Sequence, residues 1–191
     1  MRNFTIQDSR CEFDITTHSH VPNALRRALM SDITNIAPDS VTIRTNTSCQ
    51  TDEYIAHRIG LIPFRALEGA DDRATRLTVS GRMASASDIV SSAYAPYIDI
   101  PIMRLGPNQS LDLDITFRTG SGAEHARFSH ISAVSYRVDG SKTTMGFDTI
   151  TGDSPSIHIG AALDSLLKRI DDVIYFVESE YDAKHRDLTS T

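Results

Sequence analysis

The chain has 191 residues, of which 40% are hydrophobic and 23% charged, and its formal net charge is −6. This length suits one domain, or one domain interrupted by a smaller insertion, and this composition can bury a sizeable core. The acidic balance argues against direct nucleic-acid binding, because proteins that grip phosphates usually carry basic patches. No apolar run approaches the roughly 18 residues of a membrane span, and the amino terminus is too polar for a signal peptide, so we expect an intracellular protein with no membrane partner.

The first elements are predicted to be two short strands, a helix and a third strand. Apolar and polar side chains alternate over residues 3–7 and 11–16, as in half-buried strands. Apolar side chains then recur at helical spacing between residues 21 and 33. The Ala-Pro-Asp-Ser run at residues 37–40 is expected to stop this helix, because proline disfavours α geometry in the residue before it. Residues 41–46 alternate again and predict a strand.

A second, short helix is predicted after Thr51. The Thr51 hydroxyl can cap it, and Asp52 and Glu53 in its first turn are favourable against the helix dipole. Gly60 is expected to end it in the manner of a glycine just past a helix C-terminus.

The middle of the chain is predicted to be mostly β. Residues 65–76 are small and charged, which marks a loop, and residues 85–95 are expected to be irregular or briefly helical. Residues 106–109 have turn chemistry, and the Gly-Ser-Gly at residues 120–122 is interpreted as a flexible connection. Strands are predicted at residues 77–80, 98–102 and 110–117.

The last third is predicted to hold two strands and a long helix. The strands are expected at residues 131–138 and 144–150, followed by a turn at 152–155 and a helix from residue 160 to about 183. An apolar stripe on this helix fits equally packing against its own sheet and packing against a second chain. The stripe consists of Leu163, Leu166, Leu167, Ile170, Val173, Ile174, Val177 and Tyr181.

One pair of residues could carry chemistry. Glu53 and His57 are four residues apart on the second helix, a spacing that can serve a general base or half of a metal site. However, the sequence has no His-Glu-x-x-His motif and no glycine-rich nucleophile elbow. A small hydrolase that uses this pair is therefore the minor alternative.

The cysteines and the paired histidines are interpreted as structural or surface residues. Cys11 and Cys49 are too few for a four-ligand zinc site, and both are expected to be small buried side chains. His18 and His20 form an isolated His-x-His with no further ligand nearby, so surface positions are expected.

The stretch from residue 21 to residue 64 resembles the signature of the α-like subunit of multisubunit RNA polymerases. It contains the run NALRRALMSDI and, further on, TDEYIAHRIGLIPF, about a dozen nearly consecutive matches to an unusual pattern. The resemblance is to the third-largest subunit of eukaryotic RNA polymerase II and to its archaeal counterpart, whereas bacterial α shares only the NALRR helix. A second block, residues 105–111 with 124–129, and the final helix follow in the right order, so the resemblance spans nearly the whole chain.

The resemblance implies an α+β fold and a non-catalytic function. A dimerisation domain of antiparallel sheet and helices, residues 1–47 and 123–191, would be interrupted by an inserted, mostly β domain, residues 48–122. The chain would form a heterodimer with a smaller α-like subunit. That pair would be the platform on which the second-largest and then the largest subunit assemble, together with small accessory subunits. The nucleotidyl-transfer site would belong to the large subunits.

The resemblance also implies which residues meet which partner. Contact with the second-largest subunit is implied for Asn23, Arg26, Arg27, Asp52, Glu53, His57 and Arg58. Arginine suits such a contact because its planar fork can clamp carboxylates or carbonyls, although two solvated arginines are the usual alternative. The dimer interface is implied to include Leu25, Leu29, Leu163, Leu166, Leu167, Ile170, Val173, Ile174 and Val177.

Several departures from the family pattern set further expectations. Relatives often carry a zinc loop or an iron–sulfur cluster after the position of Phe64, but the cysteine ligands are missing here, so no cofactor is expected. The short chain suggests a reduced form, such as one from a large DNA virus, acting in the nucleus or cytoplasm of a host cell and packaged in virions. A homodimeric scaffold like bacterial α is the alternative, which the lack of a second, DNA-binding domain disfavours.

Overall fold

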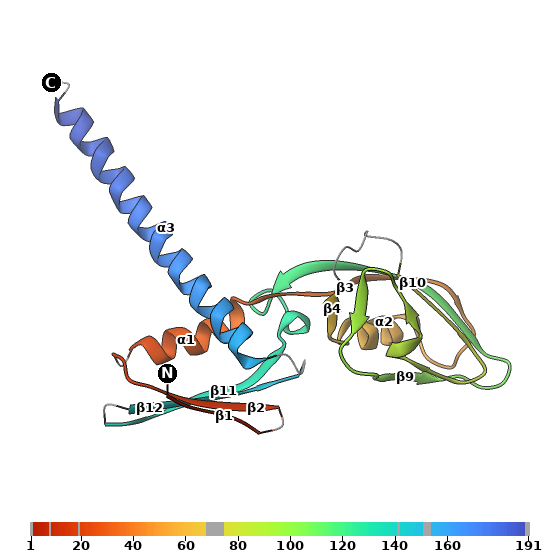
Figure 1. The fold of residues 1–191 in the computed structure, drawn as a ribbon. Helices are drawn as coiled ribbons and strands as arrows, with labels where there is room; N and C mark the ends of the chain where they lie inside the picture. The colour runs from red at the N-terminus through yellow and green to blue at the C-terminus, as the bar shows by residue number, and fades with distance from the viewer. Residues whose placement is uncertain are drawn as a thin grey trace.

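The computed structural model describes residues 2–7, 9–18, 20–67, 75–140, 142–150 and 154–189, with side chains from Asn3 to Tyr181. Within these residues the fold is α+β, as predicted. It has two four-stranded antiparallel sheets in separate lobes, and a long helix projects from one lobe (Figure 1).

The first lobe is built from the first and last parts of the chain. Its sheet has the order β1-β2-β12-β11, formed by β1 (Arg2–Gln7), β2 (Arg10–Ile15), β11 (Ile131–Asp139) and β12 (Lys142–Thr149). The helices α1 (His20–Ser31) and the start of α3 (Pro155–Thr189) cover one face of this sheet (Figure 1). The predicted alternation of β2 is confirmed, because its inward side chains lie in the core formed by Cys11, Phe13, Leu25, Ala28, Leu29, Met145, Phe147, Ile159 and Ala162.

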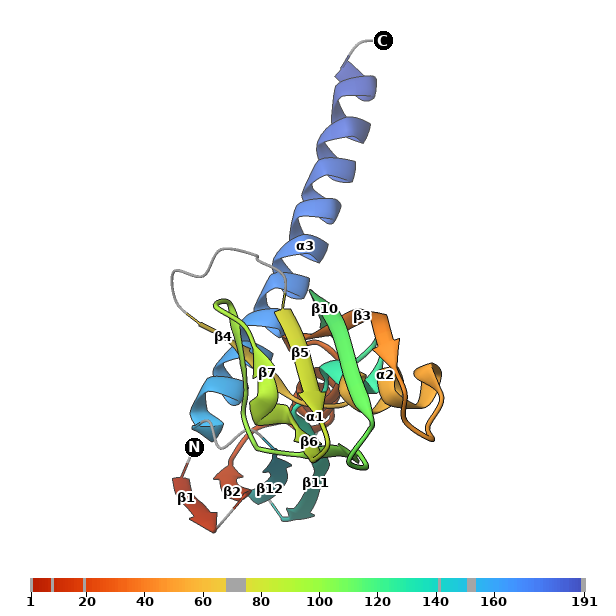
Figure 2. The same ribbon diagram turned by 90° about the vertical axis from the view of Figure 1, so that its right-hand side faces the viewer.

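The second lobe is built from the middle of the chain. Its sheet has the order β3-β10-β5-β7, formed by β3 (Thr34–Asn46), β10 (Ser110–Ser121), β5 (Thr75–Ser80) and β7 (Ile89–Val90), and Figure 2 shows β10 between β3 and β5. Two small ribbons pair β4 (Phe64–Ala66) with β8 (Tyr94–Pro96) and β6 (Met83–Ser85) with β9 (Pro101–Arg104). The remaining elements are α2 (Asp52–Gly60) and the 3₁₀ turns η1 (Ala86–Asp88) and η2 (Ala126–Phe128). Inward residues of β10 alternate as predicted and join the core of Ile55, Ile59, Phe64, Leu77, Val79, Leu111, Leu113 and Ile115.

The two lobes meet where β3 and β10 run together. At this point the ring of Phe128 lies so close to Gly120 that a Cβ there would be 2.6 Å from the ring. Asn35 Nδ2 on β3 also donates a hydrogen bond to the Phe128 carbonyl, at 2.7 Å. The prediction of a flexible connection at residues 120–122 was therefore wrong. Gly120 is the second-to-last residue of the ordered strand β10, and its lack of a side chain permits close packing rather than freedom of motion.

The end of α1 also differs from the expectation. The helix ends at Ser31, where the Ser31 hydroxyl donates to the Arg27 carbonyl at 2.7 Å, and residues 37–40 lie inside β3 instead of ending the helix. The β-branched residues that follow α1 favour a strand. Pro38 is tolerated because β3 is an edge strand and its register with β10 shifts there.

The short helix α2 has the predicted start and a different end. The Tyr54 N–H donates to Thr51 Oγ1 at 3.4 Å, which confirms the cap. Gly60, however, is the last helical residue rather than a left-handed residue beyond the helix, and the Leu61 N–H closes the turn on the Arg58 carbonyl at 3.3 Å.

Three further expectations are corrected. The helix α3 begins at Pro155 rather than residue 160, because Ser154 and Pro155 supply the usual residues before and at the first helical position. The strand expected at residues 98–102 is β9, which begins at Pro101 and ends at Arg104. Cys49 is exposed rather than buried, because it lies in the polar turn before α2, while Cys11 is buried as predicted.

Candidate interaction surfaces

The apolar stripe of α3 is the main exposed apolar surface of the described chain. Ile170 and Val173 expose 55% and 62% of their surface, large fractions for side chains that folding usually buries. Figure 1 shows that most of α3 extends away from the first lobe, which agrees with the exposure of these two side chains. Exposed members of the predicted stripe are Leu167, Ile170, Val173, Ile174, Val177 and Tyr181.

The start of α3 is fixed to the lobe, and its remainder is not. Leu163 and Leu166 are half-buried against the first core, as packing of the stripe on its own sheet requires. Arg169 Nη2 then donates to Asp32 Oδ1 at 2.7 Å. From Leu167 to Tyr181 every side chain is exposed. The two interpretations of the stripe therefore apply to different parts of it. Its first turn packs on its own sheet, and the rest is exposed, as contact with another chain would require.

Two residues expected at the dimer interface lie elsewhere. Leu25 and Leu29 are each 2% exposed and pack beneath α1 in the core of the first lobe. Because they are buried in the free chain, these two leucines would stabilise α1 at an interface without contacting the partner themselves. On α3, two exposed aromatic residues were not part of the predicted stripe, Tyr175 and Phe176. They lie off the stripe by helical spacing, so that periodicity gave no signal for them.

The residues expected to meet the second-largest subunit form two groups on different lobes (Figure 1). On α1, Asn23 and Arg27 are exposed, and Arg26 donates to Asn23 Oδ1 at 3.0 Å. This pair of side chains holds the Arg26 guanidinium on the helix surface, where part of it is accessible. The exposed Met30 beside it accepts a longer contact from Arg26, at 3.5 Å to the sulfur.

On α2, two of the four predicted residues, Asp52 and Arg58, are bonded to other elements of the chain. Asp52 accepts a hydrogen bond from Asn46 Nδ2 at 2.7 Å, and Arg58 donates to the Pro101 carbonyl at 2.7 Å. Glu53 and His57 are exposed. Asp52 and Arg58 thus hold α2 against β3 and β9, while Glu53 and His57 are the side chains most available to a partner.

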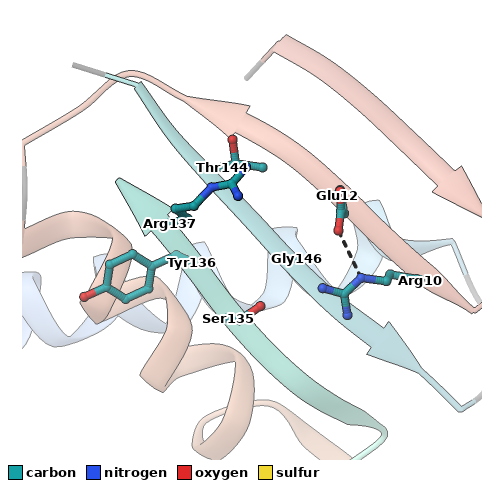
Figure 3. Close-up of a pocket in the computed structure, with 7 residues that line it drawn as sticks. All are labelled: Arg10, Glu12, Ser135, Tyr136, Arg137, Thr144 and Gly146. Carbon is teal, nitrogen blue, oxygen red and sulfur yellow. Dashed lines mark hydrogen bonds and ion pairs between the residues drawn. The ribbon is translucent and has the colours of Figure 1, made fainter. Parts of the chain in front are cut away.

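A shallow polar hollow of about 290 Å³ lies on the open face of the first sheet (Figure 3). Arg10 spans it, bonded to Glu12 at 3.0 Å and to Asp148 at 3.4 Å. The hydrogen bond to Glu12 raises the pKa of the Arg10 guanidinium, which therefore stays charged. Gly146 forms the floor, since a Cβ there would be 3.0 Å from the Arg10 guanidinium. Arg137 also lines the hollow, and the Thr144 hydroxyl at its edge donates to Asp14 Oδ1 at 2.8 Å.

An apolar hollow of about 300 Å³ lies between β1 and the first turns of α3. It is lined by Phe4, Ser156, Ile159, Gly160 and Leu163. Leu163 is also the first residue of the stripe, so the hollow continues that surface toward β1. Periodicity could have indicated Phe4 as part of β1, but not that it would lie beside α3, because that contact joins opposite ends of the chain.

Neither chemical site considered from the sequence, the hydrolase pair or a metal centre, finds support in the described residues. Glu53 and His57, the pair considered for hydrolysis, line neither hollow. No three His, Cys, Asp or Glu side chains in the described ranges gather so that they could hold a metal ion. Residues 68–74 of the loop predicted after Phe64 lie outside the described residues, so the absence of a cofactor stays a prediction. No helix in the described part is long and apolar enough to cross a membrane.

These features define an α+β protein whose most extensive candidate site is the exposed apolar stripe of α3, rather than either hollow. Its relatives include DNA-directed RNA polymerase subunit Rpo3 of Pyrobaculum aerophilum, 31% identical over 136 residues, which cover 60% of this chain and 52% of that protein. Rpo3 of Methanocaldococcus jannaschii is 30% identical over 116 residues, which cover 59% of this chain and 61% of that protein. The DNA-directed RNA polymerases I and III subunit rpac1 of Dictyostelium discoideum is 27% identical over 161 residues, or 62% and 46% of the two chains.

The chain is thus similar to DNA-directed RNA polymerase subunits of the Rpo3 and rpac1 type, in agreement with the resemblance that its motifs carry. It spans about half the length of the relatives that it matches. No protein-family model matches it.

Proposed function

We propose that this chain is the larger α-like subunit of a DNA-directed RNA polymerase and acts as a non-catalytic assembly platform. It forms a heterodimer with a smaller α-like subunit through the exposed stripe of α3. The observation that carries this proposal is the stripe itself, which continues past the last contact between α3 and the lobe at Arg169. Burial of an exposed aliphatic side chain of this size contributes about 1.5–3 kcal/mol, so several such residues support a stable pair.

The domain organisation follows from this role. Residues 1–47 and 123–191 form the dimerisation domain, and residues 48–122 are the inserted domain. Separate cores for the two lobes support such a division. The long pairing of β3 with β10 extends from one lobe into the other, so residues 34–46 are the segment shared between them.

The second partner is the second-largest polymerase subunit, bound through α1 and α2. Exposed Asn23 and Arg27 on α1, with Glu53 and His57 on α2, are the contacts that support this part of the proposal. Because the two groups lie on different lobes, a partner that touches both must span them. Small accessory subunits bind to the completed platform, and the chain itself neither binds nucleic acid nor holds a cofactor.

The place of action is the nucleus or cytoplasm of a host cell, and we propose a viral polymerase as the setting, with the protein packaged in virions. The scarcity of cysteine, with two residues in the whole sequence, supports a lineage that lost the metal loop. Finding the gene among cellular transcription genes would remove the viral part without affecting the assembly role.

The dimer is tested by single substitutions on α3. Ile170→Glu places a charge in the stripe and should abolish binding to the smaller α-like protein of the same genome, measured by co-purification. Tyr175→Glu is the matched control, because Tyr175 is 75% exposed but lies off the stripe, and binding should be retained. Equal binding by both variants would contradict the proposed interface.

The platform role is tested separately on the assembled pair. Arg27→Glu and His57→Glu should each weaken capture of the second-largest subunit without loss of the smaller α-like partner. Asp172→Lys, on an exposed part of α3, is the control. Unchanged capture in both variants would remove α1 and α2 from that contact.

A further inference from the structure

We propose that the partner of α3 presents an apolar helix face bordered by a row of lysine or arginine side chains, and that it is therefore not a second copy of this chain. This inference rests on the proposed function, because it names the chemistry of the partner at the same surface. It is carried by the charges that border the stripe.

An acidic row runs along one border of the stripe. Asp164, Asp171 and Glu178 are seven residues apart, and seven residues make almost two helical turns, so their side chains lie nearly in line. All three are exposed. Leu167 and Ile174 of the stripe lie three residues after Asp164 and Asp171, which makes them neighbours on the helix surface.

Lys168 is the described cation nearest to this row, because it follows Asp164 by four residues and precedes Asp171 by three. None of the three carboxylates forms an ion pair with a side chain that the structure describes. Lys168 lies on the side of α3 opposite the stripe, as helical spacing requires. Arg169 lies near the other border, and its guanidinium is bonded to Asp32. A partner that covers the stripe would therefore meet three carboxylates along one edge, with Lys168 on the far side of the row from the stripe.

A second copy does not supply the missing cations over the described part of α3. In an antiparallel symmetric pair, the two-fold axis places both acidic rows on the same side, where like charges face each other. In a parallel pair, each row faces the opposite border, which carries Phe176, Glu180 and the bonded Arg169. Both arrangements bury the stripe but leave the row unmatched, whereas a different helix with a basic border matches both the stripe and the row.

The experiment compares two neighbouring aspartates that differ in the side of the helix they occupy. Asp171 borders the stripe, and Asp172 lies on the opposite side, yet both are exposed and give the same charge change when replaced by lysine. The probe is the purified smaller α-like protein of the same genome, titrated at about 0.05 M and about 0.5 M NaCl to vary screening. We expect Asp171→Lys to weaken binding roughly three- to tenfold at low salt, and Asp172→Lys to change it less than about twofold.

The triple variant Asp164→Lys, Asp171→Lys and Glu178→Lys should weaken binding further, and replacing the basic border of the partner by glutamate should restore it. Equal effects of Asp171→Lys and Asp172→Lys, or no effect of the triple variant, would overturn the inference while leaving the stripe as the interface. A stable homodimer that forms through the stripe would also overturn it. If the unmodified chain does not bind the probe at all, the proposed function itself fails.

Discussion

Arg169 on α3 and Asp32 just after α1 form the last bonded contact between the projecting helix and the first lobe, with Nη2 and Oδ1 2.7 Å apart. The Asp32 side chain is almost fully buried, whereas that of Arg169 is largely exposed. Asp32 also accepts hydrogen bonds from the hydroxyls of Ser31, at 2.8 Å, and Ser165, at 3.4 Å. One carboxylate thus connects the end of α1 to α3 and sets the point at which α3 leaves the lobe.

Removing this carboxylate should destabilise the free chain. Asp32→Ala loses three acceptor contacts and should lower the free energy of unfolding by about 1–3 kcal/mol. Arg169→Ala should cost less, because its guanidinium can be solvated, and the double variant should cost less than the sum of the two. Urea unfolding measures all three, with Asp164→Ala on the exposed side of α3 as the control. Strict additivity of the two single effects would show that the contact carries no energy.

Close packing at Gly120 gives a second prediction. In Gly120→Ala the new Cβ would lie 2.6 Å from the Phe128 ring, so the ring or the strand must move, and stability should fall by about 1–3 kcal/mol. Gly60→Ala is the matched control, since nothing lies within 4 Å of a Cβ there and its backbone is helical. That control should be neutral or stabilising. Comparable urea midpoints for the two variants would show that the Phe128 contact is not tight.

Acid should weaken the second lobe through Asp112. Arg76 donates to both carboxylate oxygens, at 2.9 Å and 2.7 Å, and Thr78 donates at 2.8 Å. Chiefly through Arg76, the pKa of Asp112 is lowered from the ordinary 3.8 to about 2. The folded-state pKa lies below the unfolded one, so this stabilisation is complete above about pH 4 and is lost as the pH falls toward 2.

Asp112→Asn should therefore flatten the dependence of the urea midpoint on pH within that window, and Asp172→Asn should not. Carboxyl NMR titration of the unmodified chain would report the low pKa directly. A titration of Asp112 at its ordinary pKa would contradict the bonding described here.

Local pattern was sufficient for most elements because their periodicity and their packing agree. The alternation at Leu111, Leu113 and Ile115 predicted β10, and the Thr51 hydroxyl predicted the start of α2. The motifs in residues 21–64 likewise predicted the family. These signals are carried by neighbouring residues and do not depend on contacts between distant parts of the chain.

What the sequence could not predict depends on such distant contacts. Pro38 was expected to mark a break, but its partner strand, β10, lies some 80 residues later, and only that pairing shows that the proline is tolerated. Gly120 was interpreted as flexible because its neighbour Phe128 approaches from a different element. The sequence of the stripe did not indicate where α3 leaves the lobe, because that point is set by the bond from Arg169 to Asp32.

Our central proposal is that a different, smaller α-like chain covers the exposed stripe of α3. The most direct measurement is the native mass of the purified chain, alone and after co-expression with the smaller α-like protein of its genome. We expect a one-to-one complex that is stable through size exclusion and is lost in Ile170→Glu. A well-behaved monomer that ignores this partner would contradict the proposal.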